Sequence, residues 1–360
     1  MYMTKMKLNE KQNRKRKILW LINSKQYRPS ISLRTLLLIV IVLTLFGSLE
    51  GCSDMELNMK TNKELNSEVK ESVKEENWSF NSIPVKIGRQ GDNLKILFLL
   101  HAQYYTMKVT ENNKGEFKLL KEALKKNRKV VVKVFLKKGT SEIIKVEKGS
   151  IEDYKKIWSI YTTKMEADGS NLTDIIPDLK TLNILFETIR NEACVGIGMY
   201  ENGCIPFRYP VDGCYARAHK MRQILAKNGY DCQKQFVYGN LRAKNKRKTC
   251  CVNWGYHVAV LVKYKDETGT VQKKIIDVSL SDKGPMTESE WHTACTDSTC
   301  GKTFINSYVN TPGNVYYRSP KGQVFLYDNN YRNTDCVLKV FQWLKDCTPT
   351  PAPDVSYCPF

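Results

Sequence analysis

Cys214 is the residue that the sequence places best to act as a nucleophile. It follows Val211, Asp212 and Gly213 at the start of a predicted helix. Backbone N–H groups and the dipole at a helix start favour a thiolate, which lowers the pKa of a cysteine. Gly213 would let a substrate approach the backbone closely, and the N–H of Cys214 could help to stabilise an oxyanion. The alternative is that Cys214 is half of a disulfide.

A nucleophilic cysteine needs a base, and the chain has four histidines. His101 lies outside the cysteine-rich region, and His219 is about 140° around the helix axis from Cys214. His292 lies in a polar segment that gives it no clear place. His257 remains, at the head of an alternating strand, although a single histidine is more often a structural residue.

Asp277 is the acid that strand pairing brings to His257. Strands predicted over Tyr256–Tyr264 and Val271–Val278 flank a turn centred on Glu267. Such a turn makes His257 and Asp277 direct cross-strand neighbours with both side chains on one face. A carboxylate there would orient the imidazole and stabilise its charged form, which completes a Cys-His-Asp arrangement. The alternative is an ordinary acid at a strand end.

Trp254 and Tyr256 precede His257 and are candidate walls of a substrate cleft, with packing in the core as the alternative. Metal binding would compete for the same residue types. Cys250 and Cys251, followed by His257, could be imagined as zinc ligands, but the chain lacks paired C-x2-C elements with matching histidine spacing. We therefore predict no metal.

The helix that carries Cys214 is predicted to run to Lys227 and to end at Asn228-Gly229, a common C-terminal signal. An amphipathic helix over Pro177–Ala193 precedes it, with an apolar stripe made of Leu179, Leu182, Leu185, Phe186 and Ile189. Two further strands are predicted in this half: Gln235–Gly239 and Gln323–Tyr327. The C-terminal half is therefore expected to contain both helices and strands.

The N-terminal half predicts a smaller α+β unit that contains no cysteine. Strands are expected over four runs: Lys95–Leu100, Tyr104–Val109, Val130–Phe135 and Ile143–Val146. Helices are expected over Glu116–Lys126 and from Ser150. Residues 53–82 are polar and predict a flexible spacer, and Met165–Asn171 predicts a connector that a protease could cut. We therefore divide the chain into residues 1–52, 53–82, 83–171 and 172–360.

The cysteines indicate an oxidising compartment. Of the 12 in the chain, one is Cys52 and the other eleven follow residue 193. That density predicts a disulfide framework. Five bridges among eleven cysteines would leave one thiol, and a thiol left over in an oxidised domain is a candidate nucleophile.

The N-terminus predicts export. Residues 1–51 carry ten Lys/Arg and two Asp/Glu, and Thr35–Phe46 is an apolar run of 12 residues, as in a signal peptide. The run is followed by Leu49-Glu50-Gly51-Cys52, which resembles a lipoprotein cleavage box with Cys52 as the lipidated residue. Lipidation would anchor the exported chain to a membrane; the alternatives are ordinary cleavage nearby or a retained anchor.

The net charge of +20 does not predict a nucleic-acid surface. Much of the excess flanks the signal segment, while residues 172–360 carry 24 Lys/Arg against 18 Asp/Glu. The basic run Arg242–Lys248 is better explained as a solvated loop than as a polyanion site. We therefore predict no nucleic-acid partner.

Five segments of the C-terminal half resemble bacterial protein-glutaminase, an enzyme that deamidates protein-bound glutamine. They are Pro206–Gly239, Cys250–His257, Ile275–Leu280, Asn314–Pro320 and Pro351–Ser356. The resemblance spans nearly all of residues 172–360 and their eleven cysteines. It implies an α+β fold related to transglutaminases and papain-like cysteine enzymes, without a cofactor. It also implies Cys214 as nucleophile, His257 as base and Asp277 as orienting acid.

The resemblance further implies a pre-pro-enzyme. Residues of about 53–171 would then form a pro-domain that inhibits the enzyme until an activating protease removes it, and the mature enzyme would be extracellular. Its substrates would be proteins and peptides with accessible glutamine. Three alternatives stay open: a transglutaminase that transfers the acyl group to lysine amines, a cysteine peptidase, and a disulfide-rich secreted binding module.

Overall fold

The computed structural model describes residues 78–125, 130–150, 152–153, 171–194 and 204–358. All of them belong to one compact unit, Lys74–Phe360. The predicted signal segment, Cys52, the helix from Ser150 beyond residue 153 and nearly all of the connector at 165–171 lie outside the described residues. Within the described residues, no helix is both long and apolar enough to cross a bilayer.

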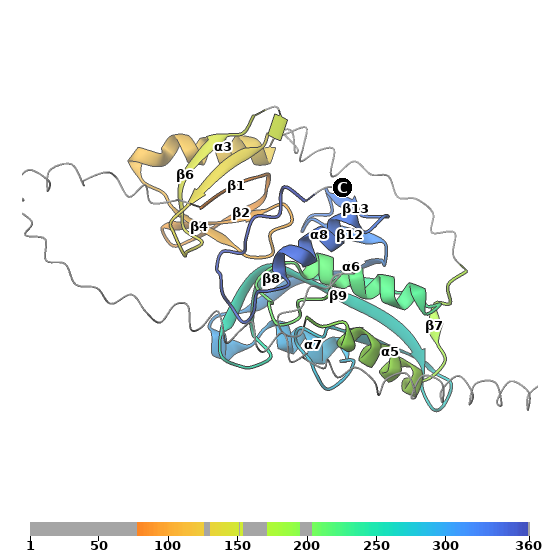
Figure 1. Cartoon of the computed structure of the whole chain (residues 1–360). Helices are drawn as coiled ribbons and strands as arrows, with labels where there is room; N and C mark the ends of the chain where they lie inside the picture. The colour runs from red at the N-terminus through yellow and green to blue at the C-terminus, as the bar shows by residue number, and fades with distance from the viewer. Residues whose placement is uncertain (1–77, 126–129, 151, 154–170, 195–203, 359–360) are drawn as a thin grey trace, which may run out of the picture. The chain divides into compact units, whose positions relative to one another are not determined.

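The N-terminal part, residues 78–153, contains two antiparallel three-stranded sheets and helix α3 (Lys114–Lys125) (Figure 1). One sheet has the order β1 (Trp78–Ser82), β5 (Val132–Leu136) and β6 (Ile143–Lys148). The other has the order β2 (Pro84–Gln90), β3 (Asn93–Phe98) and β4 (Tyr105–Lys108). The 3-10 helix η1 (Glu111–Asn113) leads into helix α3 (Lys114–Lys125). The four predicted strands and the first predicted helix are present, with ends shifted by a few residues.

The predicted spacer at 53–82 is wrong over its last five residues, which form strand β1. This strand pairs along its whole length with β5, and its Phe80 and Ser82 side chains are buried. Only these two of its five side chains face the core, so the segment has the polar composition of a linker. Strand β2 was missed for a similar reason, because four of its residues are Lys, Gly, Arg and Gln.

The C-terminal part, residues 172–358, contains a sheet with the order β10-β9-β8-β11 (Figure 1). Its strands are β8 (Gln233–Lys244), β9 (Cys251–Lys265), β10 (Val271–Ile276) and β11 (Phe304–Pro312), and the short β7 (Ile175–Ile176) pairs with β9 in parallel. Strand β9 is buried almost continuously from Val252 to Tyr264, as expected for a strand covered on both faces.

Four helices accompany this sheet: α5 (Leu179–Asn191), α6 (Cys214–Lys227), α7 (Glu288–Cys295) and α8 (Arg332–Phe341). A 3-10 helix, η2 (Ser298–Cys300), follows α7, and β12 (Val315–Arg318) pairs with β13 (Phe325–Tyr327). Helix α5 is capped by Asp178, whose carboxylate accepts the N–H of Thr181. The predicted stripe of α5 is buried except for Leu179, which lies in the first turn and is 42% exposed.

Four disulfides connect segments of the C-terminal part: Cys194–Cys204, Cys250–Cys347, Cys251–Cys300 and Cys336–Cys358. Three cysteines remain as thiols, namely Cys214, Cys232 and Cys295, and all three are buried. The prediction of five bridges and one thiol is therefore wrong. A count of cysteines fixes an upper bound on bridges but says nothing about which pairs of Cα atoms approach closely enough to be joined.

Candidate active site

The nucleophile candidate begins helix α6, and the residue before it explains the local fold. Gly213 adopts φ 78°, in the left-handed region, and a Cβ there would lie 2.7 Å from the ring of Phe341. Glycine is therefore required both by the backbone conformation and by packing. Close approach of a substrate, the reason expected from the sequence, is not the reason that this structure gives.

Burial determines the state of the Cys214 thiol. The residue is 2% exposed, and this desolvation raises the pKa of the thiol to about 12. The Arg217 guanidinium and a hydrogen bond to sulfur from the backbone N–H of Val258 act in the opposite direction but do not outweigh burial. The thiolate expected at a helix start is therefore not favoured in this form of the chain, in which Cys214 is a neutral thiol at neutral pH.

His257 and Asp277 meet as the sequence predicts, through a different register. Strand β10 pairs Ile276 with Val260, because the hairpin turn closes between Asp266 and Thr270. Asp277 follows the last paired residue, and its Oδ2 lies 2.7 Å from His257 Nε2. The predicted register is wrong by two residues, and a shift of two keeps both side chains on the same face of the sheet.

The Asp277 carboxylate is ionised although it is fully buried. Burial raises its pKa, but the charge of His257, the hydrogen bond from His257 and a third contact together lower the pKa below its ordinary value. The third contact is a hydrogen bond of 2.9 Å from the indole Nε1–H of Trp291. The N–H of Ser279 donates to Oδ1. Because a carboxylate only accepts, the proton of this pair lies on His257 Nε2.

The second ring nitrogen of His257, Nδ1, is available for proton transfer. His257 Nδ1 is buried and has no hydrogen-bond partner among the described residues. The Trp254 ring stacks on the imidazole, with centroids 4.3 Å apart and planes 5° from parallel. Trp254 is itself held by its indole N–H, which donates to the carbonyls of Pro210 and Val211. The imidazole plane is thus fixed by packing and by its acid partner.

The other three histidines lie in different settings. His219 is buried, with Nδ1 2.7 Å from Lys234 Nζ and Nε2 3.1 Å from the carbonyl oxygen of Asp328. His101 Nδ1 lies 2.8 Å from the hydroxyl of Tyr105. His292 Nε2 lies 2.7 Å from Gln235 Oε1. Of the four histidines, only His257 forms a hydrogen bond with a carboxylate of a described residue.

A segment of the N-terminal part covers the same region. The Ala102 N–H donates to Asp212 Oδ1 at 3.2 Å, and the Ala102 carbonyl accepts the N–H of Gly255 at 2.7 Å. Gln103 forms a β-bridge with Trp254. Ala102 is therefore hydrogen-bonded through both its N–H and its carbonyl. It connects Asp212, which lies two residues before Cys214, with Gly255, which lies two residues before His257.

Tyr256 and Tyr104 add side-chain contacts between the two parts. Tyr256, one of the two predicted cleft walls, is fully buried, and its hydroxyl donates to the Leu100 carbonyl at 3.2 Å. The Tyr104 hydroxyl donates to the Gly239 carbonyl at 3.1 Å. Neither Tyr256 nor the equally buried Trp254 faces solvent here.

Sequence reasoning missed Trp291 and Asp212. Trp291 lies on α7, whose start carries a capping box between Thr287 and Glu290, a pattern that is readable in the sequence. Asp212 is fully buried, and desolvation raises its pKa to about 7. Its contact with Ala102, 110 residues away, has no local sequence signal.

Comparisons with known proteins give a consistent result. The family described as Glutaminase matches residues 182–295. A crystal structure of pro-protein-glutaminase is 49% identical, with a TM-score of 0.71, and covers 79% of this chain and 99% of its own. A mutant of pro-protein-glutaminase is 48% identical, with a TM-score of 0.72, and covers 79% of this chain and 100% of its own. The chain belongs to the protein-glutaminase family.

A crystal structure of protein-glutaminase matches the C-terminal part more closely in sequence. It is 58% identical, has a TM-score of 0.50, and covers 52% of this chain and 100% of its own. Comparison with curated proteins gives no match. The difference in coverage between the protein-glutaminase structure and the pro-protein-glutaminase structures shows that this chain has a pro-domain in addition to the catalytic domain.

Among the described residues, no group of three or more His, Cys, Asp or Glu side chains is arranged to hold a metal ion. The chemistry that the site can perform with its own groups is nucleophilic attack by sulfur, proton transfer at His257 Nδ1 and charge stabilisation by Asp277.

Proposed function

We propose that the chain is the proenzyme of a protein-glutamine amidohydrolase, which converts glutamine side chains in proteins and peptides to glutamate and ammonia. The observation that carries the proposal is the free thiol of Cys214 at the start of α6. The backbone of Val258 bonds this sulfur, directly after the histidine that pairs with a buried acid. This arrangement occurs in a chain that is 49% identical in sequence to pro-protein-glutaminase.

In the first step, Cys214 attacks the carbon of the γ-carboxamide. His257 Nδ1 takes the thiol proton, and Asp277 stabilises the imidazolium through Nε2–H. The tetrahedral intermediate collapses with loss of ammonia, which takes the proton from Nδ1. The product is a thioester between Cys214 and the former glutamine side chain.

In the second step, water replaces ammonia. His257 Nδ1 removes a proton from the water as it attacks the thioester carbon, and the proton is returned to the leaving sulfur. Glutamate is released and the thiol is restored. Trp254 keeps the imidazole plane fixed during both transfers by stacking on it. The Tyr256 hydroxyl, which now donates to the pro-domain, becomes part of the cleft that binds the substrate.

The pro-domain inhibits the enzyme by two effects. It places the backbone of Ala102 between Asp212 and Gly255, where an extended substrate segment would otherwise lie. Through its contact with Asp212 it also holds the segment before Cys214 in the form in which Cys214 is buried, and burial keeps the thiol protonated. An activating protease that cuts the connector at 165–171 would allow the pro-domain to leave, and water would then reach the sulfur.

Export of the proenzyme is supported by the four disulfides, which form and persist in oxidising compartments. The signal segment at 35–46 directs it, and lipidation of Cys52 tethers the proenzyme to a membrane until cleavage frees the mature enzyme. Palmitate labelling of the full chain and of its Cys52→Ser variant tests the lipid anchor. The anchor requires that the full chain is labelled and that the Cys52→Ser variant is not.

The test of the activity uses the full chain after cleavage near the connector, incubated with a glutamine-containing protein such as casein. We expect ammonia release without chain cleavage and without cross-linked species. Cys214→Ala should abolish ammonia release, while Cys232→Ala, which removes another buried thiol, should retain it.

Other outcomes identify the alternatives. Covalent dimers of casein would indicate acyl transfer to lysine, and new chain ends would indicate a peptidase. Ammonia release that persists in Cys214→Ala at the rate of the unsubstituted enzyme would show that the mechanism proposed here is wrong.

A further inference from the structure

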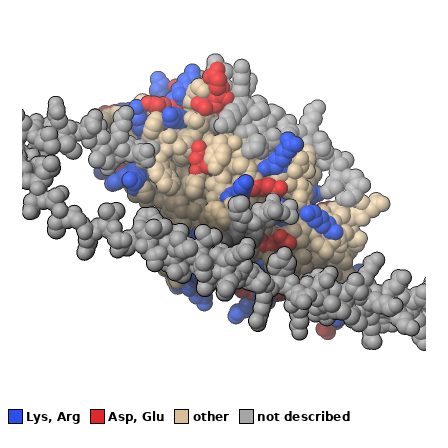
Figure 2. All heavy atoms as spheres, in the orientation of Figure 1, with Lys and Arg blue, Asp and Glu red and all other residues tan. Residues whose placement is uncertain are grey.

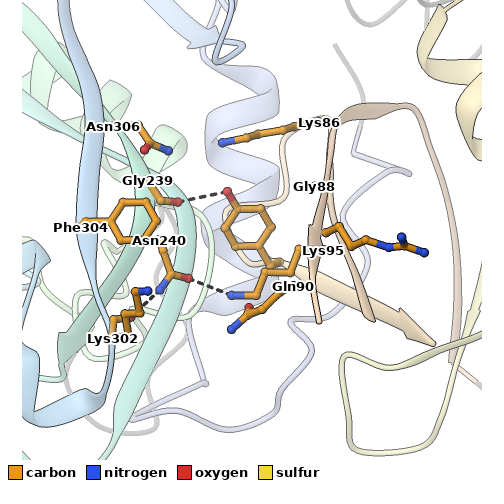
Figure 3. A pocket seen from close by; sticks show the side chains of 11 residues that line it. Lys86, Gly88, Gln90, Lys95, Gly239, Asn240, Lys302, Phe304 and Asn306 are labelled. Carbon is orange, nitrogen blue, oxygen red and sulfur yellow. Dashed lines mark hydrogen bonds between the residues drawn. The ribbon is translucent and has the colours of Figure 1, made fainter. Parts of the chain in front are cut away.

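A cavity of about 330 Å³ lies where β2 and β3 of the pro-domain face β8 and β11 of the catalytic domain (Figure 3). Its volume is at the lower end of the range of about 300–1,000 Å³ that small-molecule sites occupy. Lys86, Lys95 and Lys302 line it, and the lining contains no Asp or Glu. Arg89 also belongs to the lining.

The charges around this cavity are of one sign on both sides of the interface. Lys86 and Lys95 come from the pro-domain and Lys302 from the catalytic domain. Lys321 lowers the pKa of Lys86 and Arg242 lowers that of Lys95, in each case after the larger effect of burial. Among the described residues, no carboxylate forms an ion pair with the three lining lysines or with Lys321 and Arg242.

Interfaces within a protein normally bring opposite charges together, because like charges in a partly desolvated space repel. On the face seen in Figure 2, Lys and Arg are interspersed with Asp and Glu among uncharged residues. The cavity thus differs from that face, since its cations have no acid with which to pair. An anion would remove the repulsion, because it would bring the missing negative charge between the two domains.

The neutral side chain of Asn240 uses only one of the N–H donors of the lining lysines, so the others are available to a ligand. Asn240 connects the two sides: its Oδ1 accepts one hydrogen bond from Lys95 at 2.9 Å, and its Nδ2 donates to the Lys302 carbonyl (Figure 3). An ammonium group has three N–H donors, so Lys95 keeps two for a ligand. Lys86 and Lys302 make no side-chain hydrogen bond to a described residue. The rings of Tyr104 and Phe304 border the same space and narrow it.

We propose that this cavity is a binding site for a small multivalent oxyanion, of the size and charge of pyrophosphate, shared by the pro-domain and the catalytic domain. Oxyanions accept charge-assisted hydrogen bonds from ammonium groups, which are the groups that this site provides. Because each domain contributes part of the site, the anion binds the proenzyme and does not bind either domain after separation.

The site would regulate activation, and this consequence rests on the inhibitory role proposed for the pro-domain. A ligand that binds only the associated form stabilises that form in proportion to its concentration. The anion would therefore slow the departure of the pro-domain after cleavage. Where the anion is scarce, the uncompensated cations would favour release.

The test is calorimetric titration of the full chain with sodium pyrophosphate, in buffer of constant ionic strength adjusted with NaCl. We expect one pyrophosphate per chain. Lys86→Gln/Lys302→Gln should weaken binding by about tenfold or more, because it removes two charge-assisted donors. The control Lys108→Gln/Lys273→Gln removes the same charge from exposed lysines of β4 and β10, and it should bind as the unsubstituted chain does.

The outcomes are distinct. No binding, equal binding by the two double variants, or equal binding by the mature enzyme after loss of its pro-domain would overturn the proposal. Vesicles that contain phosphatidic acid present phosphate from a second source, and binding to vesicles without binding to pyrophosphate would also overturn it. Thermal unfolding of each variant without ligand verifies that it is folded. Since binding is measured without turnover, failure of the amidohydrolase proposal would leave this result interpretable.

Discussion

The pro-domain and the catalytic domain are stabilised in different ways. The catalytic domain carries four disulfides and a buried set of polar groups, while the pro-domain has no cysteine. The core of the pro-domain is an apolar cluster that includes Phe80, Leu94, Ile96 and Phe98. Under the function proposed above, the catalytic domain would have to persist outside the cell, whereas the pro-domain would have to persist only until cleavage. The disulfides lie in the domain that would have to persist longer.

Strand β3 shows how the two domains are nonetheless joined. Leu94, Ile96 and Phe98 point into the core of the pro-domain, and Leu97 and Leu99 belong to the larger cluster of the catalytic domain. Strand β3 together with Leu99, which follows it, thus contributes alternate side chains to both cores. The pro-domain is therefore packed into the core of the catalytic domain, and its proposed departure would expose apolar groups on both sides.

The largest effect that we expect separates the proposed catalytic centre from the buried cluster of His219, Lys234 and Asp328. Asp277→Asn should lower kcat/KM of the mature enzyme by about 10³–10⁴-fold, because the imidazolium loses its charged partner. The matched control is Asp328→Asn, which changes a buried acid near His219 and should lower stability while leaving kcat within about threefold. Steady-state ammonia release measures both, and similar losses of kcat in the two variants would remove the distinction between the clusters.

A smaller effect, the loss of single disulfides, tests whether the catalytic domain depends on disulfides and the pro-domain does not. Cys250 and Cys347 are 97 residues apart, so replacing both by Ser should cost about 4–5 kcal/mol of the free energy of unfolding of the catalytic domain. Replacing Cys194 and Cys204, which are 10 residues apart, should cost about 3 kcal/mol or less. Urea unfolding gives both values. Hydrogen exchange in β1 and β5 should change little, and a loss of protection there equal to that in β9 would contradict the contrast.

The sequence predicted the positions of the candidate site residues better than their surroundings. Cys214, His257 and Asp277 could be found because one thiol starts a helix and a hairpin brings two residues together, both of which are local signals. Other features depend on which distant segments come into contact. They are the number of free thiols, the neutral state of Cys214 and the hydrogen bond between Asp212 and Ala102. Ala102 bonds Asp212 and Gly255, and Leu97 and Tyr104 pack against Gly255, in each case from more than 100 residues away; no period in the sequence encodes these contacts.

The smallest expected effect concerns pH and the attachment of the pro-domain. Asp212 accepts the Ala102 N–H, and burial raises its pKa from the ordinary value of 3.8 to about 7. A carboxyl whose pKa is raised in the associated form binds more protons there than when it is exposed. Association is then fully favoured below pH 3.8 and weakens as the pH rises from about 4 to about 7.

A single group can change the association constant by at most about tenfold per pH unit. Asp212→Asn should therefore flatten the dependence of pro-domain dissociation on pH between 4 and 7, measured on the cleaved complex by size-exclusion chromatography. Arg217 and Cys214 also face this carboxyl, and burial raises the pKa of the Cys214 thiol to about 12, so the thiol stays neutral across that range. An unchanged pH profile in Asp212→Asn would assign the dependence to another group and leave Asp212 with a structural role alone.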